Sequence, residues 1–147
     1  MIGEVELRHA LMEAKAVALH SSRCLRKKVG AILFDREGKF LSYGANINPP
    51  GKPCDEGHCP RGQKSYAERA ADTPYDDCTA WHAEIVAVLV ASHRLGGQYA
   101  LEVDGTVVRE QLQGGVIVVT HEPCHECMPR LTVLGLNIYW PDGRVLA

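Results

Sequence analysis

The chain has 147 residues, 46% of them hydrophobic and 23% charged, which is enough for one domain with a substantial core. This composition excludes a disordered or low-complexity chain. The formal net charge of −2 at pH 7 excludes a general basic field, so we do not expect nucleic acid as a partner.

The first elements along the chain are predicted to be a helix and an antiparallel hairpin. Apolar residues recur at mostly helical spacing across residues 4–21, which is typical of an amphipathic helix. Residues 29–35, with the sequence VGAILFD, form a short apolar run that indicates a buried strand. Residues 40–46 alternate as a second strand, after a turn around Gly38.

Residues 46–80 break this regular pattern. Prolines at positions 49, 50, 53 and 60 exclude a regular helix or a central strand there. Loops of this length in a compact domain are usually functional or held by a further constraint.

The second half of the chain predicts alternating helices and strands. Residues 82–94 form a helix that is apolar almost all round, and residues 96–115 are an insertion with a hairpin signal at Asp104-Gly105. Residues 116–120 and 136–140 indicate strands, joined by a helix over residues 124–135 that Pro129 interrupts early. Strands joined by a helix are parallel, so residues 1–147 predict a single α/β domain, a three-layer α/β/α sandwich with a mixed central sheet.

The number of cysteines indicates metal binding. No apolar run approaches the roughly 20 residues of a membrane span, and the charged start of the chain has no signal-peptide core, so we expect a cytoplasmic protein. A reducing cytosol disfavours disulfides, and the six cysteines therefore favour metal ligation.

Two of these cysteines, Cys124 and Cys127, follow a predicted buried strand and are expected to open a helix. Residues three apart on a helix share a face, and the helix N-terminus favours the thiolate form that binds metal. His82 would complete three protein ligands and leave an open position, as in catalytic zinc sites. Glu84, two residues from His82, could carry protons without binding the metal.

Alternative roles for the cysteine pair fit less well. A redox pair in a thioredoxin-like protein follows the first strand, whereas Cys124 and Cys127 lie late in the chain. A zinc finger needs its second ligand pair within about 12–20 residues, and His82 lies much further from Cys124 than that. His121 and His125 are also available as ligands in place of His82.

The segments His82-Ala83-Glu84 and Pro123-Cys124-His125-Glu126-Cys127 have the His-x-Glu and Pro-Cys-x-x-Cys pattern of zinc-dependent nucleobase deaminases. On these motifs the chain resembles the cytidine/deoxycytidylate (dCMP) deaminase superfamily. The stretches RCLRKKVGAILFDREGKFLSYGAN, PPGKPCDEGHC, YDDCTAWHAE and VVTHEPCHEC are similar to bacterial and phage dCMP deaminases.

The resemblance implies an activity and a set of roles. It implies hydrolytic deamination of a small-molecule cytosine nucleotide, dCMP to dUMP with release of ammonia, by a homo-oligomer. Zinc would be held by His82, Cys124 and Cys127, and Glu84 would move the protons. The family match further implies that the Ala83 N–H binds the ring carbonyl and that Asn46 holds the substrate sugar.

Several alternatives remain open at this point. The substrate could instead be a nucleoside, a free base, a modified pyrimidine or a biosynthetic aminopyrimidine. Editing of single-stranded nucleic acid and a non-catalytic binding role are less well supported. Trp81 could equally be a core residue or a residue that lines the substrate pocket. The basic residues available for a 5′-phosphate are Arg26, Lys27, Lys52, Arg61 and Lys64.

The other four cysteines, Cys24, Cys54, Cys59 and Cys78, predict a second, structural zinc site, since four thiolates are typical of closed structural sites. Such a site would order the proline-rich loop. His58 is a spare ligand, and the alternative is four separate thiols.

Overall fold

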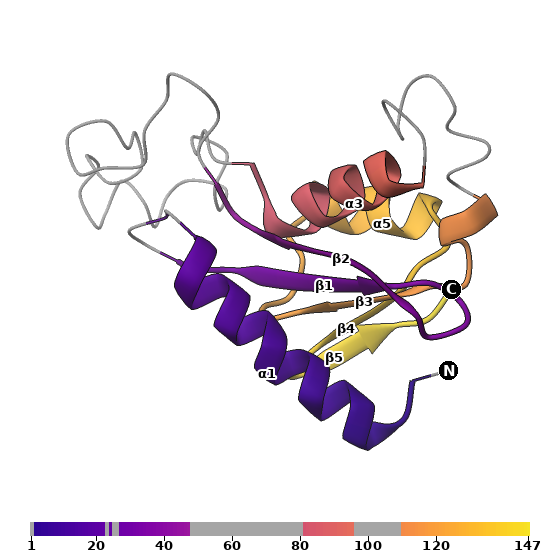
Figure 1. The fold of residues 1–147 in the computed structure, drawn as a ribbon, viewed down its shortest axis with the longest axis horizontal. Coiled ribbons are helices and arrows are strands. Elements are labelled where there is room, and N and C mark those ends of the chain that lie inside the picture. The colour runs from indigo at the N-terminus through magenta and orange to yellow at the C-terminus, as the bar shows by residue number, and fades with distance from the viewer. Residues whose placement is uncertain (1, 23, 25–26, 48–80, 96–109) are drawn as a thin grey trace.

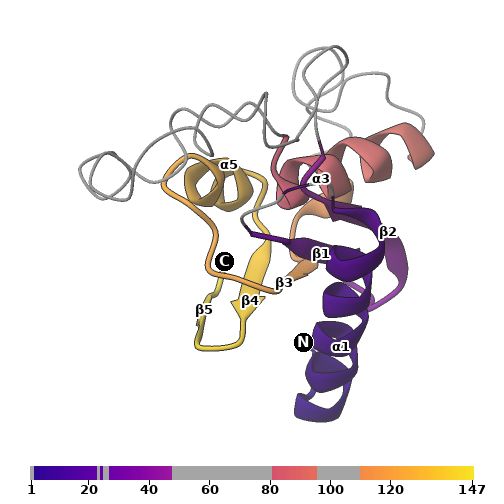
Figure 2. The same ribbon diagram turned by 90° about the vertical axis from the view of Figure 1, so that its left-hand side faces the viewer.

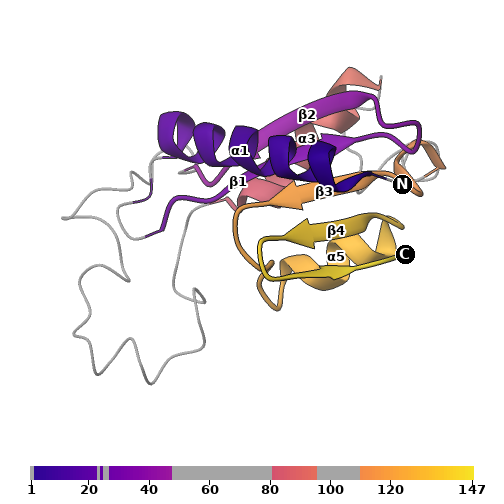
Figure 3. The same cartoon turned by 90° about the horizontal axis from the view of Figure 1, so that it is seen from below.

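The computed structural model of the chain describes residues 2–22, 24, 27–47, 81–95 and 110–147. These residues form a five-stranded sheet with the strand order β2-β1-β3-β4-β5. The strands are β1 (Gly30–Phe34), β2 (Phe40–Ala45), β3 (Val116–Val119), β4 (Asn137–Trp140) and β5 (Gly143–Val145). The β3–β4 pair is parallel and the other neighbouring pairs are antiparallel, so the sheet is mixed (Figure 3).

Helices cover both faces of this sheet. α1 (Glu4–Ser21) lies on one face, and α3 (Ala83–Arg94) and α5 (Cys127–Val133) lie together on the other (Figure 1). The view along the sheet in Figure 2 shows the same separation. α1 contacts β1, β2 and β3, while α3 contacts β1, β2 and α5. The predicted three-layer α/β/α sandwich is therefore confirmed.

The central strand β3 is buried on both faces, which explains its continuous apolar sequence. Successive side chains of a strand point to opposite faces. Ile117 and Val119 accordingly belong to the core that α3 and α5 cover, whereas Val116 and Val118 pack in the core beneath α1.

Alanines occupy the fully buried positions of α1, and Leu7 and Leu11 pack partly buried beside them against the same core. Ala10, Ala14 and Ala18 are buried, whereas Val5 and Met12 are 60% and 65% exposed. A Cβ placed on Gly30 of β1 would collide with the Ala14 carbonyl. The helix and strand backbones are thus so close that only small residues fit between them.

The C-terminal part differs from the prediction in two respects. α5 begins at Cys127, so Pro129 lies in its first turn, where the missing N–H leaves no intrahelical bond unmade, and it does not interrupt the helix. β5 was not predicted, because it has three residues and pairs antiparallel with β4 after a tight turn. Within the described ranges, no helix is both long enough and apolar enough to cross a membrane.

Candidate metal centre

The start of α3 is anchored to the end of β2. Two backbone hydrogen bonds join Ile47 and Trp81: the Trp81 N–H donates to the Ile47 carbonyl at 2.7 Å, and the Ile47 N–H donates in return at 3.1 Å. His82 follows directly as the N-cap of α3, with an extended backbone and a side chain that does not cap the helix. Its imidazole is therefore available to groups outside α3.

The His82 ring lies close to the sulfurs of both cysteines. Its Nδ1 lies 3.4 Å from Cys124 Sγ and 3.2 Å from Cys127 Sγ. Cys127 is the first residue of α5. Cys124 lies before the helix, not on it as expected, and its carbonyl accepts the Met128 N–H at 3.0 Å.

These three ligand atoms fit a tetrahedral zinc ion. They lie within 4.8 Å of one another and form a candidate metal group among the residues that the structure describes. Zn–S and Zn–N bonds of about 2.3 and 2.05 Å at a tetrahedral angle place nitrogen and sulfur roughly 3.6 Å apart. The observed separations of 3.4 and 3.2 Å are within a few tenths of an ångström of that value.

The environment of Cys127 favours the neutral thiol when no cation is bound. Burial raises the pKa of the Cys127 thiol well above its ordinary value, and the negative charges of Glu84 and Cys124 raise it further. The expected thiolate is therefore not produced by the helix terminus alone. A divalent ion between the sulfurs would supply the missing positive charge, since coordination deprotonates a thiol.

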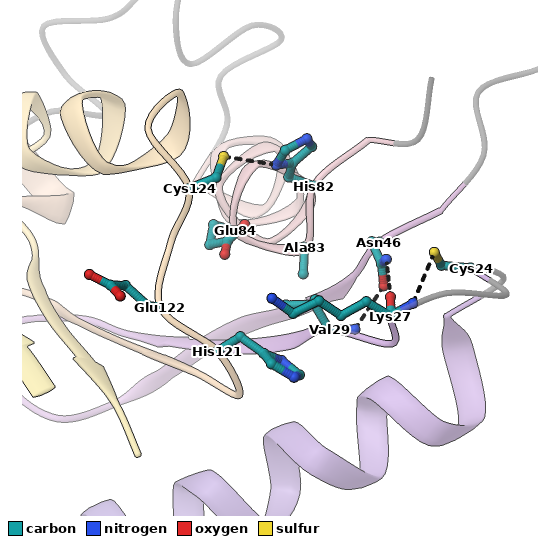
Figure 4. Close-up of a pocket in the computed structure, with 10 residues that line it drawn as sticks. All are labelled: Cys24, Lys27, Val29, Asn46, His82, Ala83, Glu84, His121, Glu122 and Cys124. Carbon is teal, nitrogen blue, oxygen red and sulfur yellow. Dashed lines mark hydrogen bonds between the residues drawn. The ribbon is translucent and has the colours of Figure 1, made fainter. Parts of the chain in front are cut away.

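Glu84 projects from the first turn of α3 and is only 4% exposed (Figure 4). Burial raises its pKa, against the opposing effects of its own backbone N–H, His82, Cys127 and Lys27. A carboxyl group whose pKa is raised, beside three candidate metal ligands, is suited to both accepting and donating a proton.

A pocket opens beside this group (Figure 4). Asn46 and Ala83 line it, as the predicted substrate roles require, and Lys27 lines it too. Trp81 is not among the described lining residues, and its side chain is 46% exposed. The described lining residues are Cys24, Lys27, Val29, Asn46, His82, Ala83, Glu84, His121, Glu122 and Cys124.

Sequence reasoning did not identify Val29 and Glu122 as pocket residues, nor His121 as other than an alternative ligand. The antiparallel pairing of β1 with β3 brings the start of β1 beside the end of β3, and thus these residues together. His121 Nδ1 lies 2.8 Å from Thr120 Oγ1, which also accepts the Gly30 N–H at 3.1 Å. Burial and then Lys27 lower the pKa of His121, which favours the neutral ring.

The prediction of a second zinc site falls mostly outside the described residues. Cys54, Cys59 and Cys78 lie there, as do Arg26, Lys52, Arg61 and Lys64. Cys24 is buried, lines the pocket, and its Sγ accepts the Lys27 N–H at 3.4 Å. The second zinc stays a prediction.

Solved structures share the fold. The dCMP deaminase of cyanophage S-TIM5, in complex with dCMP and dUMP, matches with a TM-score of 0.63 and 22% identity, over 95% of this chain and 83% of that one. A mutant cytidine deaminase from Mycobacterium tuberculosis matches with a TM-score of 0.51 and 18% identity, over 96% and 90% of the two chains. At these identities the likeness establishes the fold alone.

Sequence comparison is more specific. A deoxycytidylate deaminase from Schizosaccharomyces pombe (strain 972 / ATCC 24843) is 29% identical over 127 residues, which is 86% of this chain and 34% of the relative. The chain thus spans about a third of the length of that relative. The family model of the cytidine and deoxycytidylate deaminase zinc-binding region matches residues 5–138. This match covers nearly the whole chain and confirms the expected superfamily, a class of zinc-dependent deaminases. The chain belongs to the cytidine and deoxycytidylate deaminase family.

Proposed function

We propose that this protein is a zinc-dependent enzyme that hydrolyses a cytosine nucleotide, converting dCMP and water to dUMP and ammonia. The observation that carries the proposal is the convergence of His82 Nδ1 on the sulfurs of Cys124 and Cys127, with the buried Glu84 carboxyl at the same pocket. Three ligands with a carboxyl group beside them are what water activation by zinc requires.

The residues of the pocket divide the chemistry between them. Zinc, when bound, supplies the Lewis acidity that lets water ionise near pH 7. Glu84 would take a proton from the attacking water and pass it to ring N3, while the water oxygen bonds to C4. Glu84 then moves the second proton to the amino group, the C4–N bond breaks, and ammonia leaves as the C4 carbonyl forms.

The same pocket offers groups to hold the substrate. Ala83 is the first residue of α3, where a backbone N–H has no acceptor within the helix, and we assign this N–H to the ring carbonyl. Lys27 is the candidate phosphate ligand that lies on the described pocket. The phage enzyme solved in complex with dCMP and dUMP, and the yeast deoxycytidylate deaminase, favour a nucleotide over other substrates.

The role of Glu84 is tested by Glu84→Gln, which keeps the size of the side chain and removes its acid–base chemistry. We expect bound zinc to be retained and ammonia release to fall by at least about a thousandfold. Glu37→Gln, the same change in an exposed hairpin turn, is the matched control. Near-wild-type turnover of the Glu84 variant would rule out the proposed proton transfer.

The substrate is tested by ammonia release from dCMP, dCTP, cytidine, cytosine and single-stranded DNA. We expect dCMP to give the highest kcat/KM, and Lys27→Met to raise KM for dCMP more than for cytidine. A protein that prefers cytidine, or that acts on none of the panel, would contradict the nucleotide assignment. The homo-oligomer that the family resemblance implies is checked by sedimentation equilibrium.

A further inference from the structure

Three large apolar side chains are exposed in one line along α1. Val5, Met12 and Leu19 are 60%, 65% and 68% exposed. Each is seven residues from the next, which is two helical turns, so they lie on one side of α1, away from the sheet. Figure 3 views the molecule from the side of α1. In the described parts of α3 and α5 such residues occur singly, as Val90 and Val133, and single ones are ordinary on a protein surface.

Charges of opposite sign flank this apolar line. Arg8 and Lys15 lie along one side of it, each three residues after a member of the line. Glu6 and Glu13 lie along the other side, each one residue after a member. All four side chains are exposed, and none of them is in an ion pair within the part of the chain that the structure describes. The two sides of the line thus carry charges that are free to meet a partner.

The pattern is that of a short heptad repeat. In such a repeat, positions a and d face the partner helix and positions e and g flank them. When Val5, Met12 and Leu19 are placed at d, His9 and Ala16 fall at a. The basic side then occupies g and the acidic side occupies e.

This assignment makes the surface complementary to itself. In a parallel pair of helices, a g residue meets the e residue five positions later on the other helix, so Arg8 of each copy would meet Glu13 of the other. In an antiparallel pair, each side would face the same side of the other copy, and the basic residues would meet one another. Charge complementarity therefore favours a parallel pair, in which a two-fold axis repeats every contact.

The acidic side of α1 also borders a groove that suits basic side chains. The groove lies between α1 and the turn that joins β1 to β2, and its charged or titratable lining residues are Glu6, His9, Glu13, Asp35, Arg36 and Glu37. Four of these are carboxylates and one is an arginine, so the groove is negatively charged when His9 is neutral. The basic side of a second copy seated on the apolar line would lie beside this groove.

We propose that α1 is an interface between two copies of this chain, which pack their α1 helices in parallel around a two-fold axis. Val5, Met12 and Leu19 form the apolar centre, and Arg8 of each copy pairs with Glu13 of the other. The 18 residues of α1 span about 27 Å. A contact of this length lies at the small end of specific interfaces, so the association is reversible. The inference concerns assembly and does not depend on the proposed deaminase function.

Sedimentation equilibrium of the zinc-loaded protein tests the apolar centre. The wild-type mass should rise with concentration to at least twice that of one chain. Met12→Glu buries a charge in the interface and should raise the dissociation constant by at least about tenfold. Val133→Glu is the matched control, because Val133 is equally exposed, at 65%, on the opposite face of the sheet. That control should associate as the wild type does.

Native mass spectrometry of two charge-reversed variants tests the pairing and its direction. Arg8→Glu and Glu13→Arg should each weaken self-association by about tenfold, because like charges then meet twice in every dimer. An equal mixture of the two variants should form a heterodimer about as tight as the wild-type dimer, since opposite charges meet again at both contacts. The variants differ in mass, which separates the heterodimer from the two homodimers. An antiparallel pair would show no such recovery.

Three results would overturn the proposal. The first is a wild-type protein that stays monomeric up to about 1 mM. The second is a Met12→Glu protein that associates as the wild type does. The third is a heterodimer no tighter than the homodimers of the two charge-reversed variants. Thermal unfolding identifies a variant that fails to fold, and in that event the charge-reversed pair decides, because both of its positions are exposed.

Discussion

At Gly44 the backbones of β2 and α3 lie in close contact, and Gly44→Ala should therefore disturb the candidate metal centre from outside it. Gly44 pairs with Ala31 in the sheet and faces α3. A Cβ at this position would lie 2.5 Å from the Ala87 backbone nitrogen and would collide with the Ala83 carbonyl. Both are backbone atoms, so no side-chain rotation can make room.

The size of the effect follows from this geometry. Overpacking of a rigid contact costs about 1–3 kcal/mol of unfolding free energy, which for a domain of this size lowers Tm by roughly 2–12 °C. Relief requires α3 to move away from β2, and His82 lies at the start of α3. Zinc ligand distances tolerate only about ±0.2 Å, so we expect zinc binding to weaken roughly 10–100-fold.

Thermal unfolding and competition with a chromophoric zinc chelator measure the two effects. Gly30→Ala is the matched control, because a Cβ there collides with α1 on the opposite face of the sheet. That variant should lose comparable stability but keep near-wild-type zinc affinity. Equal zinc affinities in the two variants, or a Gly44→Ala protein as stable as the wild type, would refute the link between this contact and the metal centre.

Three further predictions concern the site and its support. Cys127→Ser should remove one equivalent of zinc per chain by elemental analysis, and an unchanged zinc content would exclude this sulfur as a ligand. Leu131→Ala should cost about 2–5 kcal/mol in urea unfolding, since Leu131 is fully buried in the helix that carries Cys127; a cost below about 1 kcal/mol would contradict its core position. In the metal-free protein, burial raises the pKa of Glu84, so the folded state favours the protonated carboxyl group. The wild-type protein therefore has its full stability at low pH, and it loses part of that stability as the pH rises through the pKa of Glu84 in the folded state. Glu84→Gln should therefore be more stable than wild type at pH 8 and equal to it below about pH 4, and the opposite trend would contradict the raised pKa.

The sequence alone determined most of the elements and the candidate ligand set. Strands such as residues 116–120 and helices such as residues 82–94 were predictable, because apolar periodicity and turn residues act over a few neighbouring positions. The His-x-Glu and Pro-Cys-x-x-Cys motifs identified His82, Cys124 and Cys127, which the fold brings together. Motif spacing carried this information because zinc chemistry restricts the residue types that can bind it.

Only the tertiary structure decided how these parts are supported. The fully buried positions of α1 are alanines because Gly30 brings the β1 backbone against the helix. Asn46 bonds to Ser22, Lys27 and Val29 because the β1–β2 ladder ends beside the end of α1. The pKa values of Glu84 and Cys127 rise because packing removes water from them. Each of these depends on groups that are distant in the chain, and local sequence patterns carry no record of which distant groups will meet.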